Sequence, residues 1–547
     1  MNDERIKSDL ITCHHLSVVR GLKQSAKWSA ELLFSLHKAN QLDDDGNESM
    51  GADTSQPDTH IAINEPDYLI AKSCFDLGEY KRCSHFVQNS KRRESQFLYY
   101  YSLYMNAEKR RLDLMTEMSV NVSATTSSTD NSYDLFNELR SQLQNLYVDG
   151  KLDNDGYLLY VYGIVMLKLD LNTDAAEVLC KSIQKEPLNW ASWHQLALII
   201  EDKNQLDAFT LPTHWFKNFF LGAVYLELQL NEEALEKYEK LALLFPTCDY
   251  LRSQMAIAKH NLRDVDGAIE LFKELRLSDP YRLDATDIYS NLLYLKDMRP
   301  ELSSLAHAAN QVDPYRVESC CCIANFYSLR GQHAKAVLYF YRALQLNPKH
   351  LSAWTLMGHE YMELKNTGAA IQAYRAAIKC NRRDYRAWYG LGQTYEILKM
   401  PSYCLYYYSM ARALRPNDPR MMIATGETLE KLDRNGDALK CYWKAGRMAL
   451  VKLAQLYEKM GEKEKAAAAY TDFIQRSENG SEAGGGDATE LCTCYRFLAT
   501  YHLNRKELKH AYTAAQKCTT FPEARDEGKN VLKQVISEAK NSLQDLN

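Results

Sequence analysis

Small and aromatic residues recur along most of this chain at one constant spacing, and this pattern predicts repeated pairs of helices. Two segments aligned on Trp354 and Trp388 share their glycines, tyrosines and alanines in register: Gly358 with Gly392, Tyr361 with Tyr395, Tyr374 with Tyr408, and Ala377 with Ala411. A small residue lets two helices approach closely, and an aromatic side chain fills the gap between neighbouring repeats. The pattern therefore indicates many similar layers of packed helices.

Prolines mark the same period. Five of the 13 prolines follow this period, with Arg382 in the one skipped position: Pro246, Pro280, Pro314, Pro348 and Pro416. Proline cannot continue a helix, so it follows the second helix of each pair. A two-helix period of about 34 residues is the length of the tetratricopeptide repeat (TPR). We expect an all-α TPR solenoid, a right-handed superhelix of about 12–14 helix pairs stacked around one continuous core.

Departures from the period divide the chain. The expected parts are an N-terminal helix (1–38) with a break at Gly21, an acidic loop (39–66), degenerate repeats (67–189), a truncated repeat (190–214), regular repeats (215–476), a flexible loop (477–488), and a final hairpin with a capping helix (489–547). Residues 119–132 are rich in Ser and Thr and are predicted to be a disordered insert. The degenerate repeats are the candidate dimerisation region, and the regular repeats are expected to carry a peptide-binding groove.

Charge and hydropathy exclude two classes of partner. The formal net charge of −5 and the short basic runs argue against a nucleic-acid binder, which would carry a basic face. The start of the chain, MNDERIKSDL, is charged and lacks the apolar segment of a signal peptide. No stretch approaches 18 consecutive apolar residues, so no membrane span is expected. The 14 cysteines are then expected to be reduced and mostly in the core.

Motifs of catalysis and of cofactor binding are missing from the sequence. There is no GxxxxGK[ST] loop, no HExxH, no GxSxG and no CxxC pair. The cysteine triplet 320–322 lies in a predicted helix, where successive residues point about 100° apart and cannot share one tetrahedral zinc ion. Cys13-His14-His15 is too tight for the same reason. We therefore predict no enzyme activity, no metal and no cofactor.

A TPR solenoid offers a concave surface that is lined by the first helix of each repeat. The ninth and nearby positions of these helices form a polar strip with two carboxylates and an aromatic ring: Asn291, Asn325, His359, Glu363, Tyr389, Gln393 and Glu396. Amide side chains can hydrogen-bond the backbone of an extended peptide, and the carboxylates suit an arginine. The other interpretation is that these are ordinary polar residues on a solvated face.

Longer sequence segments resemble a known family. Residues 354–416, with AWTLMGHEYMELKNTGAAIQAYRAAI and DYRAWYGLGQTYEILKMPSYCLYYY, resemble TPR subunit 8 of the anaphase-promoting complex, or cyclosome. The segments GLKQSAKWSAELLFSL and TTFPEARDEGKNVLKQ resemble the opening and closing helices of that family. The resemblance thus extends over nearly the whole chain.

This resemblance implies a function that the repeat pattern does not supply. Members of the family are non-catalytic scaffolds of a cullin-RING ubiquitin ligase in nucleus and cytoplasm, which marks cell-cycle proteins for degradation and promotes mitotic exit. They assemble with other TPR subunits, form homodimers through N-terminal repeats, and bind arginine-containing N-terminal motifs of WD40 coactivators. The family groove includes an asparagine in the pattern N-[FY]-Y-S-L-R, which is Asn325 in residues 325–330 here.

Two other functions compete with this one. The first is a generic TPR adaptor or co-chaperone, which holds a C-terminal carboxylate with lysine, arginine and asparagine. Glu363 and Glu396 have the opposite charge and favour a basic ligand. The second is an enzyme, such as a glycosyltransferase, with appended repeats. It would need an α/β segment, and the repeats leave no length of chain for one.

Overall fold

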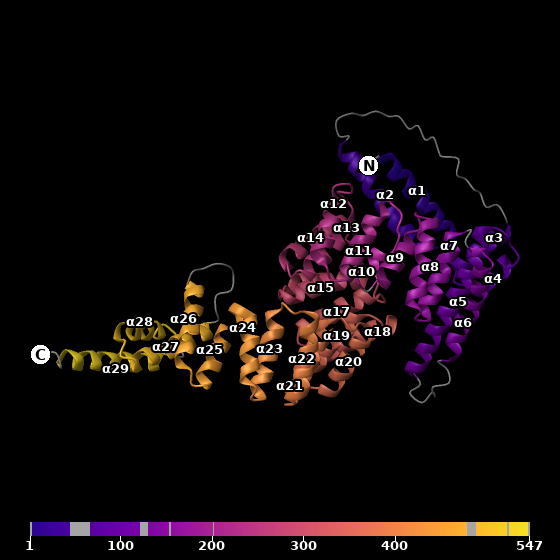
Figure 1. Ribbon diagram of the computed structural model, residues 1–547. Coiled ribbons are helices and arrows are strands. Elements are labelled where there is room, and N and C mark those ends of the chain that lie inside the picture. Colours follow the sequence, from indigo (N-terminus) through magenta and orange to yellow (C-terminus); the bar gives the residue numbers. More distant parts are fainter. Residues whose placement is uncertain are drawn as a thin grey trace. The chain divides into compact units, whose positions relative to one another are not determined.

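Helices make up all of the regular structure in the described part of the chain, which confirms the predicted all-α TPR fold (Figure 1). The computed structural model describes residues 3–43, 66–120, 130–152, 155–200, 202–478, 488–521 and 525–544. It forms two compact units, Met1–Asp313 and Pro314–Asn547. Within the described ranges, no helix combines the length and the hydropathy that a membrane crossing requires.

The first unit consists of helices that pack mainly against their neighbours in sequence. In chain order they are α1 (Asp3–Arg20), α2 (Lys23–Asp43), α3 (Pro66–Asp76), α4 (Tyr80–Val87), α5 (Arg93–Val120), α6 (Asp130–Val148), α7 (Gly156–Lys168), α8 (Asn172–Lys185), α9 (Trp190–Ile199), α10 (Lys203–Ala208), α11 (Phe216–Glu227), α12 (Asn231–Ala242), α13 (Asp249–Asn261), α14 (Val265–Ser278), α15 (Thr286–Leu295) and α16 (Arg299–Val312).

The second unit continues the alternation of a first, or A, helix and a second, or B, helix. Its helices are α17 (Val317–Leu329), α18 (His333–Leu346), α19 (Leu351–Glu363), α20 (Thr367–Cys380), α21 (Tyr385–Ile397), α22 (Pro401–Leu414), α23 (Pro419–Lys431), α24 (Asn435–Ala445), α25 (Leu450–Lys459), α26 (Lys463–Glu478), α27 (Ala488–Asn504), α28 (Leu508–Cys518) and α29 (Arg525–Gln544). A single 3-10 turn, Gly446–Ala449, joins α24 to α25.

The helix boundaries in the structure can be compared with the irregular segments predicted from the sequence. The first helix is divided at Gly21, where φ is +77°. The truncated repeat has a six-residue second helix, α10. The ends of the predicted acidic loop, disordered insert and flexible loop belong to helices α2, α3, α5, α6, α26 and α27, while their centres, 44–65, 121–129 and 479–487, lie outside the described residues.

Each A helix from α11 to α23 ends in the same left-handed turn. Residues with φ between +52° and +72° recur once per repeat: Gln229, Arg263, Asp297, Gly331, Lys365, Lys399 and Asp433. At Lys399, its own N–H bonds to Glu396 O at 2.9 Å and the following N–H, of Met400, bonds to Tyr395 O at 3.0 Å. This is a Schellman motif, which satisfies the last carbonyls of the helix. Most of these positions lack glycine, so the turn stores backbone strain.

Replacing Lys399 by glycine is expected to stabilise α21 and α22. Glycine adopts a left-handed conformation without the Cβ clash, and we expect a gain of about 0.5–1 kcal/mol in local unfolding free energy after its larger chain entropy is subtracted. Amide hydrogen exchange of 385–414 measures this gain. Gln372→Gly, in the interior of α20, is the control. It should lower the local unfolding free energy of α20 by about 1 kcal/mol. Equal losses in both variants would contradict the assignment of strain.

The glycine and tyrosine slots of the sequence pack directly against each other. A Cβ added to Gly358 would lie 2.5 Å from Tyr374, and one added to Gly426 would lie 2.5 Å from Tyr442. Gly392 faces Tyr408 in the same way. The A helix therefore needs glycine here, because the ring of the B-helix tyrosine occupies the space of a side chain. This contact brings the two helices of each repeat together.

The N-terminal helices are part of the core of the first unit. Trp28 on α2 stacks on Trp190 of α9 with ring centroids 4.1 Å apart, and it meets Phe216 and Phe219 of α11 edge-on at 5.2 and 5.4 Å. At the edge of this contact, Lys27 Nζ lies 2.6 Å from Asp284 Oδ2. Helix α2 is thus held against repeats that come much later in the chain.

Candidate functional site

The predicted site residues fall in both units. Asn291 is half-buried on α15 of the first unit, and the other predicted residues belong to the second unit. Within the second unit, one slot of successive A helices forms what we call the polar strip: Asn325, His359, Gln393 and Glu427. Residues one period apart occupy the same place in each A helix, so these side chains share one face of the stack.

Exposure differs along the polar strip. His359 and Gln393 are exposed and Glu427 is half-buried. Asn325 is only 3% exposed, within a stretch of α17 that is buried from Ser319 to Asn325. Asn325, which the sequence predicts to line the concave surface, is therefore not accessible to a ligand there, because its side chain is buried. All three thiols of the cysteine triplet in this stretch are buried, as core packing predicts.

His359 combines solvent exposure with dense surroundings. Its Nδ1 lies 2.8 Å from the hydroxyl of Tyr374 on α20. Desolvation lowers the pKa of His359, and the positive charge of Arg386 lowers it further, against the carboxylates of Asp384 and Glu363. The imidazole is therefore neutral at pH 7, and because Nδ1 is bonded to Tyr374, only Nε2 remains for a ligand.

Glu363 is the open carboxylate of the site. It is the last residue of α19 and is exposed. Among the described residues no lysine, arginine or histidine forms a salt bridge with it. A carboxylate in this position keeps its oxygens available for a cationic ligand.

Glu396 is already occupied. Its carboxylate accepts a hydrogen bond from the Tyr408 hydroxyl at 3.0 Å and one from Lys431 Nζ on the next A helix at 2.5 Å. The same arrangement recurs one repeat later, where Glu430 accepts from Tyr442 at 3.2 Å and pairs with Lys459. The ion pair raises the pKa of Lys431. These carboxylates link adjacent repeats, which leaves Glu396 less suited to a ligand than Glu363.

Tyr389 and Gln393 continue the site on α21. Tyr389 is half-buried with its ring 5.3 Å from that of Tyr408. Desolvation raises the pKa of Tyr389, and the nearby charge of Arg420 opposes the rise. The amide of Gln393, one helical turn further, is exposed. Together they offer an aromatic face beside a donor and an acceptor.

Two arginines that sequence reasoning missed stand at the starts of the A helices. Asp384 caps α21 through a 3.0 Å bond from the Arg386 N–H, and its Oδ1 lies 3.4 Å from Arg386 Nε. Asp418 and Arg420 repeat this arrangement on α23, at 3.1 and 3.6 Å. The signal was the Asp-x-Arg pair that recurs one repeat later. The site is therefore of mixed charge rather than acidic.

A buried acidic group was also missed. Glu360 of α19 is 5% exposed and accepts hydrogen bonds from Ser328 Oγ at 2.7 Å and from His333 Nδ1 at 2.8 Å. It links α17, α18 and α19. A buried carboxylate with two such partners fixes the register of two repeats.

Comparison with protein families gives four matches. Residues 5–256 match the model of anaphase promoting complex subunit 8 / Cdc23. Residues 317–350, 355–399 and 448–479 each match a tetratricopeptide-repeat model. Residues 5–256 are therefore similar to the Cdc23 family. The resemblance drawn from the sequence is thereby confirmed.

Several curated relatives share the Cdc23 or subunit 8 name. The chain is 47% identical over 304 residues to the human cell division cycle protein 23 homolog, covering 55% of this chain and 49% of that protein. It is 40% identical over 256 residues to anaphase-promoting complex subunit 8 of Arabidopsis thaliana, covering 47% and 43%. The chain spans about half the length of the curated relatives it matches.

A solved structure shares the fold. The crystal structure of the APC/C hetero-tetramer Cut9-Hcn1 aligns with a TM-score of 0.52 at 14% identity, covering 87% of this chain and 97% of that one. The likeness at this identity concerns the fold alone. The Cdc23-family match ends at residue 256, within α13, whereas Asn325, His359 and Gln393 of the polar strip lie in segments matched by repeat models.

Proposed function

We propose that this protein is a non-catalytic scaffold subunit of the anaphase-promoting complex, and that its repeats hold partner chains of that ubiquitin ligase in nucleus and cytoplasm. The observation that carries the proposal is the Cdc23-family match over residues 5–256. The names of relatives at 46–47% identity support it. A solenoid of helix pairs suits the role, because it presents long surfaces to several partners at once.

Purification of the tagged protein from cell extract tests this assignment. We expect a cullin, a RING chain and further TPR subunits in equal amounts with it. Recovery of a chaperone alone would favour the co-chaperone function and remove the scaffold proposal.

The proposal includes a homodimer formed through the N-terminal repeats, where α3 exposes Leu69 and Ile70 by 54% and 45%. Sedimentation of the purified chain tests it, and a concentration-independent monomer would exclude it.

We further propose that the polar strip and its neighbours bind the arginine-containing N-terminal motif of a WD40 coactivator. Support comes from the open carboxylate of Glu363, which suits a bidentate guanidinium. The neutral ring of His359 and the exposed amide of Gln393 can hydrogen-bond the backbone of the peptide. Asn325 is buried, so we do not expect it to contact the peptide directly.

Glu363→Gln is expected to weaken binding of such a peptide three- to tenfold, because it removes one partly exposed charge-assisted hydrogen bond worth about 1 kcal/mol. Fluorescence anisotropy with a labelled coactivator peptide measures the loss. Replacing the peptide arginine by lysine should weaken binding to the unmodified protein by a similar factor, and the two losses should not add.

The control is Glu464→Gln on the B helix α26, whose carboxylate is exposed and pairs with Arg505 at 2.7 Å. It should leave peptide affinity unchanged. A peptide that ends in acidic residues with a free carboxylate tests the co-chaperone function in the same assay. Unchanged affinity of both Glu363→Gln and His359→Ala for the coactivator peptide would place the binding site elsewhere.

A further inference from the structure

The turn between α27 and α28 places two histidines and a glutamate close together. Lys506 in this turn has φ of +62°. Its N–H bonds to Leu503 O at 3.0 Å and the N–H of Glu507 bonds to His502 O at 3.0 Å. This Schellman motif folds the chain back so that Glu507 lies against His502, at the end of α27. His510 follows three residues after Glu507, on the same face of α28.

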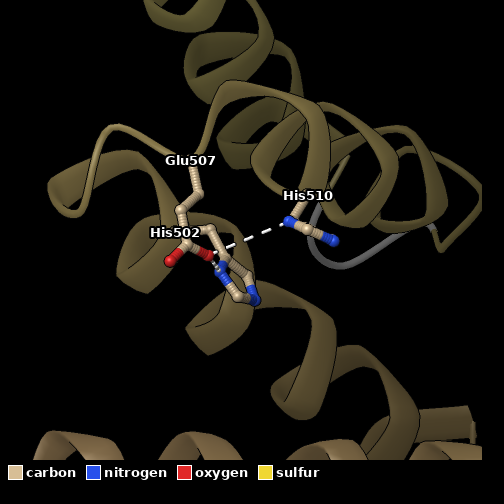
Figure 2. A group of neighbouring side chains, drawn as sticks. All are labelled: His502, Glu507 and His510. Atoms are coloured by element: carbon tan, nitrogen blue, oxygen red, sulfur yellow. Dashed lines mark hydrogen bonds and ion pairs between the residues drawn. The ribbon is translucent and has the colours of Figure 1, made fainter.

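The polar atoms of the three side chains converge (Figure 2). Glu507 Oε2 lies 2.7 Å from His502 Nδ1 and 3.8 Å from His510 Nδ1. The ligand atoms of all three residues lie within 4.8 Å of one another. The rings of His502 and His510 are 5.4 Å apart between centroids. One small ion can therefore reach all three groups.

These distances fit a tetrahedral zinc ion. Zinc binds histidine nitrogen and carboxylate oxygen at about 2.0–2.2 Å, so neighbouring ligand atoms stand about 3.3 Å apart. The observed 2.7 and 3.8 Å lie on either side of this value. Small side-chain rotations suffice to equalise them, because the His510 side chain is 73% exposed and that of Glu507 is 43% exposed.

We propose that His502, Glu507 and His510 form a zinc site that clasps the end of α27 to the start of α28. Two imidazoles with one carboxylate suit zinc and related transition metals, whereas magnesium and calcium prefer oxygen ligands alone. Each imidazole binds as the neutral ring, with its Nδ1 as the ligand and its proton on Nε2. The fourth position is open to water or to a partner side chain, because the cluster lies at the surface.

Three basic residues flank the cluster, and two of them, Lys506 and Lys509, are exposed to solvent, which screens their charge. Arg505, in the turn itself, has its guanidinium on Glu464 Oε1 at 2.7 Å, so its charge is balanced. The sequence pattern is H-x4-E-x2-H. The metal motifs sought in the sequence do not include it, because its spacing crosses a turn rather than following one helix. The expectation of no metal site rested on the missing CxxC and HExxH motifs and on the tight spacing of the cysteine triplet and of Cys13-His14-His15.

Zinc titration of the untagged full chain by isothermal calorimetry tests the site. We expect one zinc per chain that is lost, or bound at least tenfold more weakly, in His510→Gln and in Glu507→Gln. The matched control is His307→Gln, an exposed histidine on α16 of the other unit, which should bind zinc as the unmodified chain does. His510 is exposed enough that its replacement should leave the fold intact.

Cobalt substitution identifies the ligands. A tetrahedral cobalt spectrum without the charge-transfer bands of thiolate ligation supports the proposed site. Added zinc should also slow hydrogen exchange at the α27–α28 turn in the unmodified chain and leave the rate unchanged in His510→Gln. Equal zinc uptake by the unmodified chain and His510→Gln, or a thiolate spectrum, would overturn the proposal.

Discussion

Gly392→Leu is expected to disrupt α21 and α22, with a loss of about 3 kcal/mol or more in their local unfolding free energy. A Cβ at this position would overlap the ring of Tyr408, which is 1% exposed. The ring cannot retreat, because its hydroxyl is bonded to Glu396 at 3.0 Å and the ring lies in the core. The leucine therefore has to push two close-packed helices apart.

Hydrogen exchange of residues 385–414, together with the thermal midpoint of the chain, measures this effect. The control is Gly436→Leu in α24, where an added Cβ meets nothing within 4 Å. Leucine is the better helix former, so this variant should be neutral or stabilising by up to about 1 kcal/mol. Full protection of α21 and α22 in Gly392→Leu would contradict the packing of glycine against tyrosine.

Trp28→Ala is expected to detach α2 from the first unit, at a cost of about 3–5 kcal/mol. The indole is 5% exposed and stacks on Trp190 at 4.1 Å, with Phe216 and Phe219 at its edges. Its loss removes the centre of this aromatic cluster, and the polar contact of Lys27 with Asp284 is too exposed to compensate.

Limited proteolysis and hydrogen exchange of residues 23–38 measure the release of α2. Phe34→Ala is the matched control, since Phe34 lies on the same helix and is 68% exposed. It should change protection little. Similar exchange of α2 in Trp28→Ala and in the unmodified chain would show that the helix is held by contacts other than this cluster.

Most of the fold follows from local patterns that the sequence displays directly. The constant interval between repeats, the proline after several B helices and the pairing of glycine with tyrosine recur along the chain. Each repeat buries the same slots against its neighbours, so the pattern of one repeat predicts the next. Gly390 was missed because its contact, Tyr374, lies on the preceding repeat rather than its own.

For the candidate site, the sequence predicted only which face of the stacked A helices carries it. The slot of His359 and Gln393 was identified from the period, and both side chains are exposed. The period did not predict whether each carboxylate is already bonded within the protein. Glu363 is open, whereas Glu396 is bonded to Lys431 on the next repeat. Such a partner depends on how two repeats are rotated against each other, which the spacing of one repeat does not contain.

The sequence by itself determined the repeat, the class of fold and the face that carries the polar strip, because these depend on periodic burial that every repeat restates. Only the tertiary structure decided that Asn325 is buried and His359 exposed, although both occupy the same slot. It also decided that His502, Glu507 and His510 meet across a left-handed turn. The physical reason is that exposure and pairing depend on neighbours brought together by packing, which identical slots do not share.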